Sequence, residues 1–150
     1  MLFRVAPALA AVSLAAAGVV PAESDQPDAL KSRLRRIEES FRQGNAGALR
    51  DSCASSGKVR VDLRGLTDGP ASYAPGQLQV VFERIFGENR TREFAFRQDD
   101  LQVSAARTAF ARASWTRRGP PGAQEAAEHL TFTLREEGGD WRIQEIRSSR

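Results

Sequence analysis

Apolar residues recur with a helical period after residue 26 and again near the middle of the chain. Within 27–43 they fall at i, i+4, i+7 and i+11, which is one face of an α-helix. The residues on this face are Leu30, Leu34, Ile37 and Phe41. A short helix is predicted over 46–54 with Asn45 as its N-cap, and a third over 75–86 with Pro75 in its first turn.

The apolar period changes to two elsewhere, which predicts strands with one buried face. One strand is expected over 58–63, between the second and third helices. The later strands are predicted over 92–103, 108–117, 127–136 and 141–147, with a hairpin turn at 137–140. In 92–103, Asp99 and Asp100 form either a bulge or a turn that splits the segment.

A row of small residues lies on one face of the predicted strand 108–117. It consists of Ala109, Ala111 and Ala113, followed on the same face by Trp115. Such a row leaves room for a ligand or for a closely packed helix.

The order of these elements is helix, short helix, strand, helix and then a group of antiparallel strands. Helices and strands that are segregated along the chain are typical of an α+β domain in which helices pack on one sheet. We therefore expect a single domain over 23–150, with N-terminal helices packed on a strongly bent antiparallel sheet.

The first 22 residues have the pattern of a secretory signal peptide. A cation at Arg4 precedes an apolar run over 5–20, and small residues at Val20 and Ala22 suit cleavage after Ala22. A membrane anchor is the alternative, but the run is rich in alanine and shorter than the ~20 strongly apolar residues that span a bilayer. The sequence predicts export to the periplasm or the extracellular space, with no stable membrane anchor after cleavage.

Composition argues against several classes of protein. Loss of Arg4 with the signal peptide lowers the formal charge from +3 to +2, and the cations are interspersed with acids, so a nucleic-acid partner is not expected. One cysteine excludes an internal disulfide, and one histidine and one cysteine are too few for a Cys/His zinc site. Since no glycine-rich phosphate loop occurs either, we expect no metal, nucleotide or flavin cofactor.

Several segments together resemble the nuclear transport factor 2-like superfamily, whose members share a cystatin-like cone. They are SYAPGQ at 72–77, the aromatic helix end at 82–86, REF at 92–94 and GGDWRIQEIR at 138–147. Within the superfamily, the chain is most similar to a family of small exported bacterial domains of unknown function. The resemblance implies a bent sheet closed by helices around a cavity. The aromatic residues expected to meet a ligand in such a cone are Tyr73, Phe82, Phe86, Phe94, Trp115 and Phe132.

The superfamily also includes isomerases, cyclases and dehydratases, so catalytic residues were sought. Proton transfer requires a carboxylate or histidine as base and a group that stabilises the enolate. The candidates are Tyr73, His129, Asp62, Asp99 and Asp100, but none lies in a motif that matches a catalytic member, and no catalytic residue is assigned. Cys53 is expected to be buried and inert, with an intermolecular disulfide or a reactive thiol as alternatives.

Three functions remain open from the sequence. The favoured one is an exported, non-catalytic module that binds a small apolar or amphipathic molecule, or a protein partner, through its cone or sheet face. The alternatives are a cyclase- or isomerase-like enzyme and a structural protein that forms a homodimer through its sheet. A pocket without two converging ionisable groups would count against the enzyme, whereas a filled cone with an exposed apolar sheet face containing Trp115 would favour an interaction protein.

Overall fold

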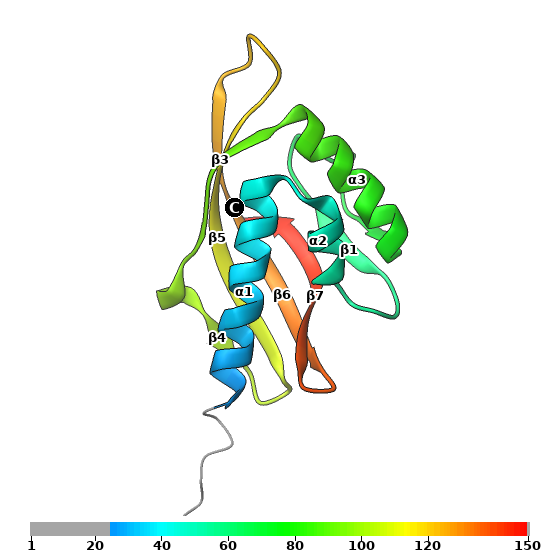
Figure 1. The fold of residues 1–150 in the computed structure, drawn as a ribbon, viewed down its shortest axis with the longest axis vertical. Coiled ribbons are helices and arrows are strands. Elements are labelled where there is room, and N and C mark those ends of the chain that lie inside the picture. The colour runs from blue at the N-terminus through cyan, green and yellow to red at the C-terminus, as the bar shows by residue number, and fades with distance from the viewer. Residues whose placement is uncertain (1–24, 150) are drawn as a thin grey trace, which may run out of the picture.

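A computed structural model describes residues 25–149 and shows helices packed on a bent, mixed sheet (Figure 1). The helices are α1 (Asp25–Gln43), α2 (Ala46–Asp51) and α3 (Pro75–Glu88), each in a segment where the apolar period predicts one. The predicted signal peptide lies outside the described residues and stays a prediction.

The sheet has seven strands. They are β1 (Val59–Asp62), β2 (Ala71–Tyr73), β3 (Arg90–Phe96), β4 (Gln102–Val103), β5 (Thr108–Arg118), β6 (Glu125–Glu137) and β7 (Asp140–Ser148). Their order is β2-β1-β7-β6-β5-β3, and β4 pairs with β5 beside β3. The tight turn between β6 and β7 has positive φ at Gly138 and Gly139, which glycine adopts without the clash that a Cβ would cause.

The sheet differs from the prediction at one edge. β1 pairs with β7 in parallel, so the sheet is mixed and not wholly antiparallel. β2, in a stretch for which the sequence predicts no helix or strand, is held by antiparallel pairing with β1. Alternation of apolar residues reports which face of a strand is buried but carries no information on strand direction. A strand of three residues is too short to show the alternation at all.

The segment predicted as one strand over 92–103 is divided in two. β3 and β4 both pair with β5, through Phe96 opposite Ala113 and Gln102 opposite Phe110. Between them the 3-10 helix η1 (Gln98–Asp100) leaves the sheet. The expectation of a turn at Asp99 and Asp100 is therefore confirmed, and the sheet edge has a gap beside α1.

Aromatic side chains fill the centre of the cone. The ring of Phe41, from the last turns of α1, lies with its centroid 4.2 to 6.1 Å from five other aromatic rings. These belong to Phe82, Phe86, Phe94, Trp115 and Phe132. Edge-to-face and stacked pairs of this kind add to the apolar area that the rings bury. The alanine row of β5 faces the same interior, as predicted.

Candidate functional site

A cavity of about 550 Å³ lies beside the N-terminal half of α1, at the gap between β3 and β4. Its walls come from three parts of the fold: one stripe of α1, the segment from the end of β3 to β4, and β5. The lining residues are Lys31, Leu34, Arg35, Glu38, Phe96, Arg97, Gln98, Asp99, Leu101 and Ala111. Its volume falls within the ~300–1,000 Å³ common for small-molecule sites.

Two local features open this cavity. The backbone N–H of Arg97 donates to the carbonyl of Arg112 at 2.8 Å, after which η1 turns out of the sheet. Opposite the gap, β5 presents Ala111, whose side chain ends at Cβ. A larger residue at position 111 would fill the space that η1 leaves, so the small side chain and the interrupted edge act together.

The inner part of the cavity is apolar. Leu34, Phe96 and Ala111 are buried in the core, and Leu101 is half-buried against it. Burial of apolar surface contributes about 25 cal/mol per Å². A molecule with an apolar body would therefore gain free energy by displacing water from this wall.

The rim of the cavity carries two cations without partners. Lys31 and Arg35 are exposed, lie one turn apart on α1, and make no hydrogen bond or ion pair with any residue of 28–149. Like charges at i and i+4 of a helix destabilise it by roughly 0.2–0.5 kcal/mol. Asp28, one turn before Lys31, forms no ion pair with it.

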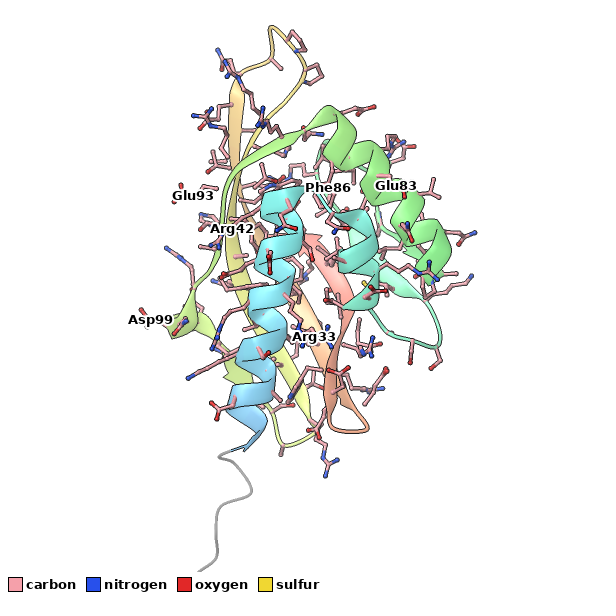
Figure 2. The ribbon with its side chains drawn as sticks, in the orientation of Figure 1. Arg33, Arg42, Glu83, Phe86, Glu93 and Asp99 are labelled. Atoms are coloured by element: carbon pink, nitrogen blue, oxygen red, sulfur yellow. The ribbon has the colours of Figure 1, made fainter. Side chains whose placement is uncertain are left out.

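The other charged groups of the cavity are differently placed. Both carboxylate oxygens of Glu38 accept hydrogen bonds, one from the Phe96 backbone N–H at 2.9 Å and one from Arg42 at 3.4 Å. Arg97 pairs with Asp100 at 3.6 Å. Figure 2 shows Asp99 at the outer edge of η1, on the side away from α1. Among residues 28–149, Lys31, Arg35 and Asp99 are the charged groups of this lining without a hydrogen bond or ion pair, so two free cations stand against one free anion.

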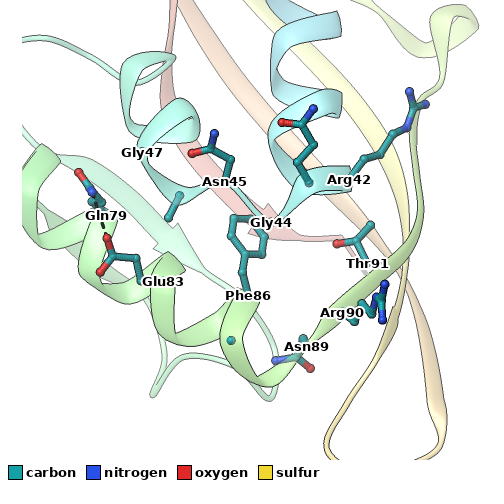
Figure 3. Close-up of a pocket in the computed structure, with 13 residues that line it drawn as sticks. Arg42, Gly44, Asn45, Gly47, Gln79, Glu83, Phe86, Asn89, Arg90 and Thr91 are labelled. Atoms are coloured by element: carbon teal, nitrogen blue, oxygen red, sulfur yellow. Dashed lines mark hydrogen bonds between the residues drawn. The ribbon is translucent and has the colours of Figure 1, made fainter.

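A wider hollow of about 780 Å³ opens at the C-terminal end of α1 (Figure 3). Most of its polar side chains already bind other parts of the protein, with Arg90 as an exposed exception. Asn45 accepts from the Ala48 N–H and caps α2, Gln79 bonds to Arg50 and Glu83, and Thr91 accepts from Trp115. These groups hold the local structure, so we place the candidate site in the smaller cavity.

Five of the six aromatic residues proposed from the resemblance belong to the cluster around Phe41 in the core, and the sixth, Tyr73, lies in β2. Phe82, Phe94, Trp115 and Phe132 have 0% exposed surface, and Tyr73 and Phe86 are partly buried against the core. None of the six lines the 550 Å³ cavity, and Phe86 lines the wider hollow. Contact of these residues with a ligand stays a prediction.

The residues that do line the cavity were not proposed from the sequence as a site. Leu34 and Phe96 follow the apolar period and are predicted simply as core. The usable signal was the alanine row of β5, which predicted spare room and includes Ala111. The break in the sheet edge, which decides where that room lies, depends on tertiary structure.

The five residues considered for catalysis are spread over the fold. Tyr73 and Asp62 lie in β2 and β1 at one side of the sheet, while Asp99 and Asp100 lie in η1 at the other. His129 is exposed on the outer face of β6, where its Nδ1 lies 3.3 Å from the Ser114 hydroxyl. The structure does not bring the five together at one point.

Cys53 is buried, as the favoured interpretation of its sequence position predicts. Its Sγ donates to the Leu49 carbonyl at 3.3 Å. Burial raises the pKa of the thiol to about 12, against the weaker opposing effect of Arg142 and Arg33. The thiolate, which is the nucleophilic form, is therefore disfavoured at neutral pH.

Within residues 25–149, no group of three or more His, Cys, Asp or Glu side chains is arranged to hold a metal ion. No helix in this part of the chain combines the length and apolar character needed to cross a membrane.

Comparison with known proteins finds similar folds and no similar sequences. No protein-family model and no curated protein sequence matches the chain. A ketosteroid isomerase-like protein from Erwinia carotovora atroseptica is 14% identical, with a TM-score of 0.67 over 84% of this chain and 96% of that one. An NTF-2 like protein of unknown function from Shewanella oneidensis is 12% identical, with a TM-score of 0.63 over 83% and 98%.

A protein of the DUF4783 family from Bacteroides uniformis is also similar in structure. It is 12% identical, with a TM-score of 0.61 over 77% of this chain and 94% of that one. At such identities these likenesses establish the fold, which is nuclear transport factor 2-like as the resemblance implied, and carry no activity with them.

Proposed function

We propose that the protein is an exported, non-catalytic module that binds a small amphipathic molecule in the cavity beside α1. The observation that carries this proposal is the cavity itself, which has an apolar inner wall and, at its rim, two cations that make no hydrogen bond or ion pair within residues 28–149. The aromatic cluster nearby is filled, so the open space lies beside it, with Phe96 belonging both to the cluster and to the cavity wall.

An enzyme of the isomerase or cyclase type has less support, although several ionisable side chains, Lys31, Arg35 and Glu38 among them, do converge on the cavity. Proton transfer needs a base that is free to take a proton within reach of the substrate. Glu38 faces the cavity, but its two oxygens accept hydrogen bonds from Phe96 and Arg42, and these bonds join α1 to β3 and to itself. Asp99 lies at the exposed outer edge of η1.

A protein that dimerises through its sheet also has less support. Among the described residues, the large apolar side chains with substantial exposure are Val80, Val103 and Phe110, on three different elements. Trp115 has no exposed surface. An interface that resembles a divided core would need a larger continuous apolar patch.

Binding can be measured with a neutral fluorescent probe such as N-phenyl-1-naphthylamine, whose emission rises in an apolar site. We expect saturable binding to the protein without residues 1–22. Ala111→Phe should weaken it at least tenfold because the new ring fills the cavity. Ala127→Phe makes the same change on the exposed outer face of β6 and should leave binding unaltered.

A second cavity variant guards against misfolding of Ala111→Phe, since Ala111 is buried. Leu101→Trp changes a half-buried position at the cavity and is easier for the fold to accommodate. Unaltered probe binding by a folded cavity variant, or no binding by the original protein, would rule out this site.

A further inference from the structure

The molecule bound beside α1, we infer, is an amphipathic anion whose apolar body lies against Leu34, Phe96 and Ala111 and whose carboxylate lies between Lys31 and Arg35. This inference rests on the proposed function and goes further, because it specifies the charge of the ligand and its direction in the cavity. It follows from the distribution of charge around the rim.

The cations are distinguished by what surrounds them. Arg36, the next residue along α1, lines a different hollow that also contains Glu39 and Asp51. Arg33 is paired with Asp140 at 2.7 Å. By contrast, Lys31 and Arg35 face a cavity whose inward carboxylate, Glu38, is already bonded to the Phe96 N–H and to Arg42.

The positions of the two cations orient the ligand. Residues i and i+4 of a helix are neighbours on its surface, so Lys31 and Arg35 present an ammonium and a guanidinium to the same space. Leu34 lies between them in sequence and is buried, which places apolar surface directly below the charges. Because a carboxylate accepts charge-assisted hydrogen bonds from both kinds of donor, it suits this rim, while an apolar chain suits the wall beneath it.

The remaining charges of the cavity modify this arrangement and do not reverse it. Arg97 adds a third cation, which is shared with Asp100 at 3.6 Å. Asp99 also lines the cavity and adds one anion, which the cations Lys31, Arg35 and Arg97 outnumber. A cationic ligand would have to approach Lys31 and Arg35 to reach the apolar wall, and like charges would repel it.

The test compares three molecules with one apolar chain and different head groups. Decanoate is anionic, decanol is neutral and decyltrimethylammonium is cationic. Each is used to displace N-phenyl-1-naphthylamine from the protein without residues 1–22, the two ions below their micelle concentrations and decanol below its aqueous solubility. We expect decanoate to bind at least tenfold more tightly than decanol, and the ammonium to bind most weakly. Added salt should reduce the preference for decanoate, since exposed charges are screened.

Two double variants with the same change in net charge complete the experiment. Lys31→Gln with Arg35→Gln should bring decanoate down to the affinity of decanol and leave decanol unaffected. Arg36→Gln with Arg135→Gln removes two exposed cations that do not line the cavity, and should preserve the preference. All four positions are exposed, so these variants are expected to fold.

The outcomes separate the two proposals. Equal binding of decanoate and decanol, or a preference that survives in the Lys31 and Arg35 variant, would overturn the inference and leave the binding function intact. Failure of all three molecules and of the neutral probe to bind would overturn the proposed function and the inference with it.

Discussion

Arg33 and Asp140 connect α1 to the start of β7 through a partly buried ion pair. The Arg33 side chain is 8% exposed and its Nη2 donates to both oxygens of Asp140, at 2.7 and 2.9 Å, while Nη1 donates to Ser52 at 3.2 Å. Loss of the carboxylate would leave a guanidinium in the interior without its counter-charge, which is costly.

We predict that Asp140→Asn lowers the free energy of unfolding by about 1–2 kcal/mol, below the full value of a buried pair because Asp140 is itself partly exposed. Urea denaturation followed by circular dichroism measures this change. Asp68→Asn, at an exposed carboxylate, is the control and should alter stability by less than about 0.5 kcal/mol. Equal effects of the two substitutions would show that the ion pair contributes nothing.

The same ion pair predicts that the stability of the fold depends on pH. Burial acts to raise the pKa of the Asp140 carboxyl, but the hydrogen bonds and the charge of Arg33 outweigh it and hold the pKa below the ordinary 3.8. Because the folded-state pKa is the lower one, the stabilisation is complete above the unfolded-state pKa and is lost as the pH falls through the folded-state value. The difference between the original protein and Asp140→Asn should therefore be largest near neutral pH and shrink as the pH falls below the ordinary 3.8.

Cys53 gives a prediction about reactivity. With its pKa raised to about 12 and its side chain buried, the thiol should react with iodoacetamide at neutral pH far more slowly than a free cysteine. Concentrated guanidinium chloride should restore rapid labelling, as mass spectrometry would detect. Fast labelling of the folded protein would mean that the segment around Cys53 opens readily and exposes the thiol.

The helix α1 has two distinct ends. Its last turns insert Phe41 among the aromatic rings of the core, while its first half forms one wall of the candidate cavity. The long apolar stripe of this helix predicted that it would be buried. The stripe did not predict that one part of the helix packs against aromatic rings while another part borders the cavity. This difference arises because the neighbouring sheet edge is interrupted between β3 and β4.

We predict that Phe41→Ala costs about 3–5 kcal/mol, because it removes a ring in contact with five others and leaves a void. Phe110→Ala makes the same chemical change at a side chain that is 42% exposed and should cost well under half as much. Thermal and urea denaturation of the two variants give the comparison. A small effect at Phe41 would contradict the central role of the aromatic cluster.

The whole molecule has a cone-shaped fold whose centre is occupied by side chains and whose cavity lies to one side of it. This arrangement explains why the aromatic residues expected to meet a ligand are buried, and why the cavity is lined by residues from α1 and the broken edge of the sheet. The fold alone leaves the function open, since proteins that share one fold can have unrelated functions.

Export is a property of the whole chain and is tested separately. We predict that the full chain, produced in a bacterium with a secretory pathway, loses residues 1–22 and accumulates outside the cytoplasm. Cell fractionation and the intact mass of the product would measure both. A double variant, Val12→Arg with Leu14→Arg, interrupts the apolar run and should stay unprocessed in the cytoplasm, whereas processing of both forms would contradict the prediction.

The local pattern of apolar residues was sufficient to predict the three helices, the buried face of each long strand, the turn at Asp99 and Asp100, and the burial of Cys53. Each of these features depends on residues that are close in the sequence, or on whether a side chain is buried or exposed. The parallel pairing of β1 with β7, the strand β2 and the position of the cavity depended on tertiary structure. They arise where segments distant in sequence meet, and periodicity records which side of an element is buried but not what it is buried against.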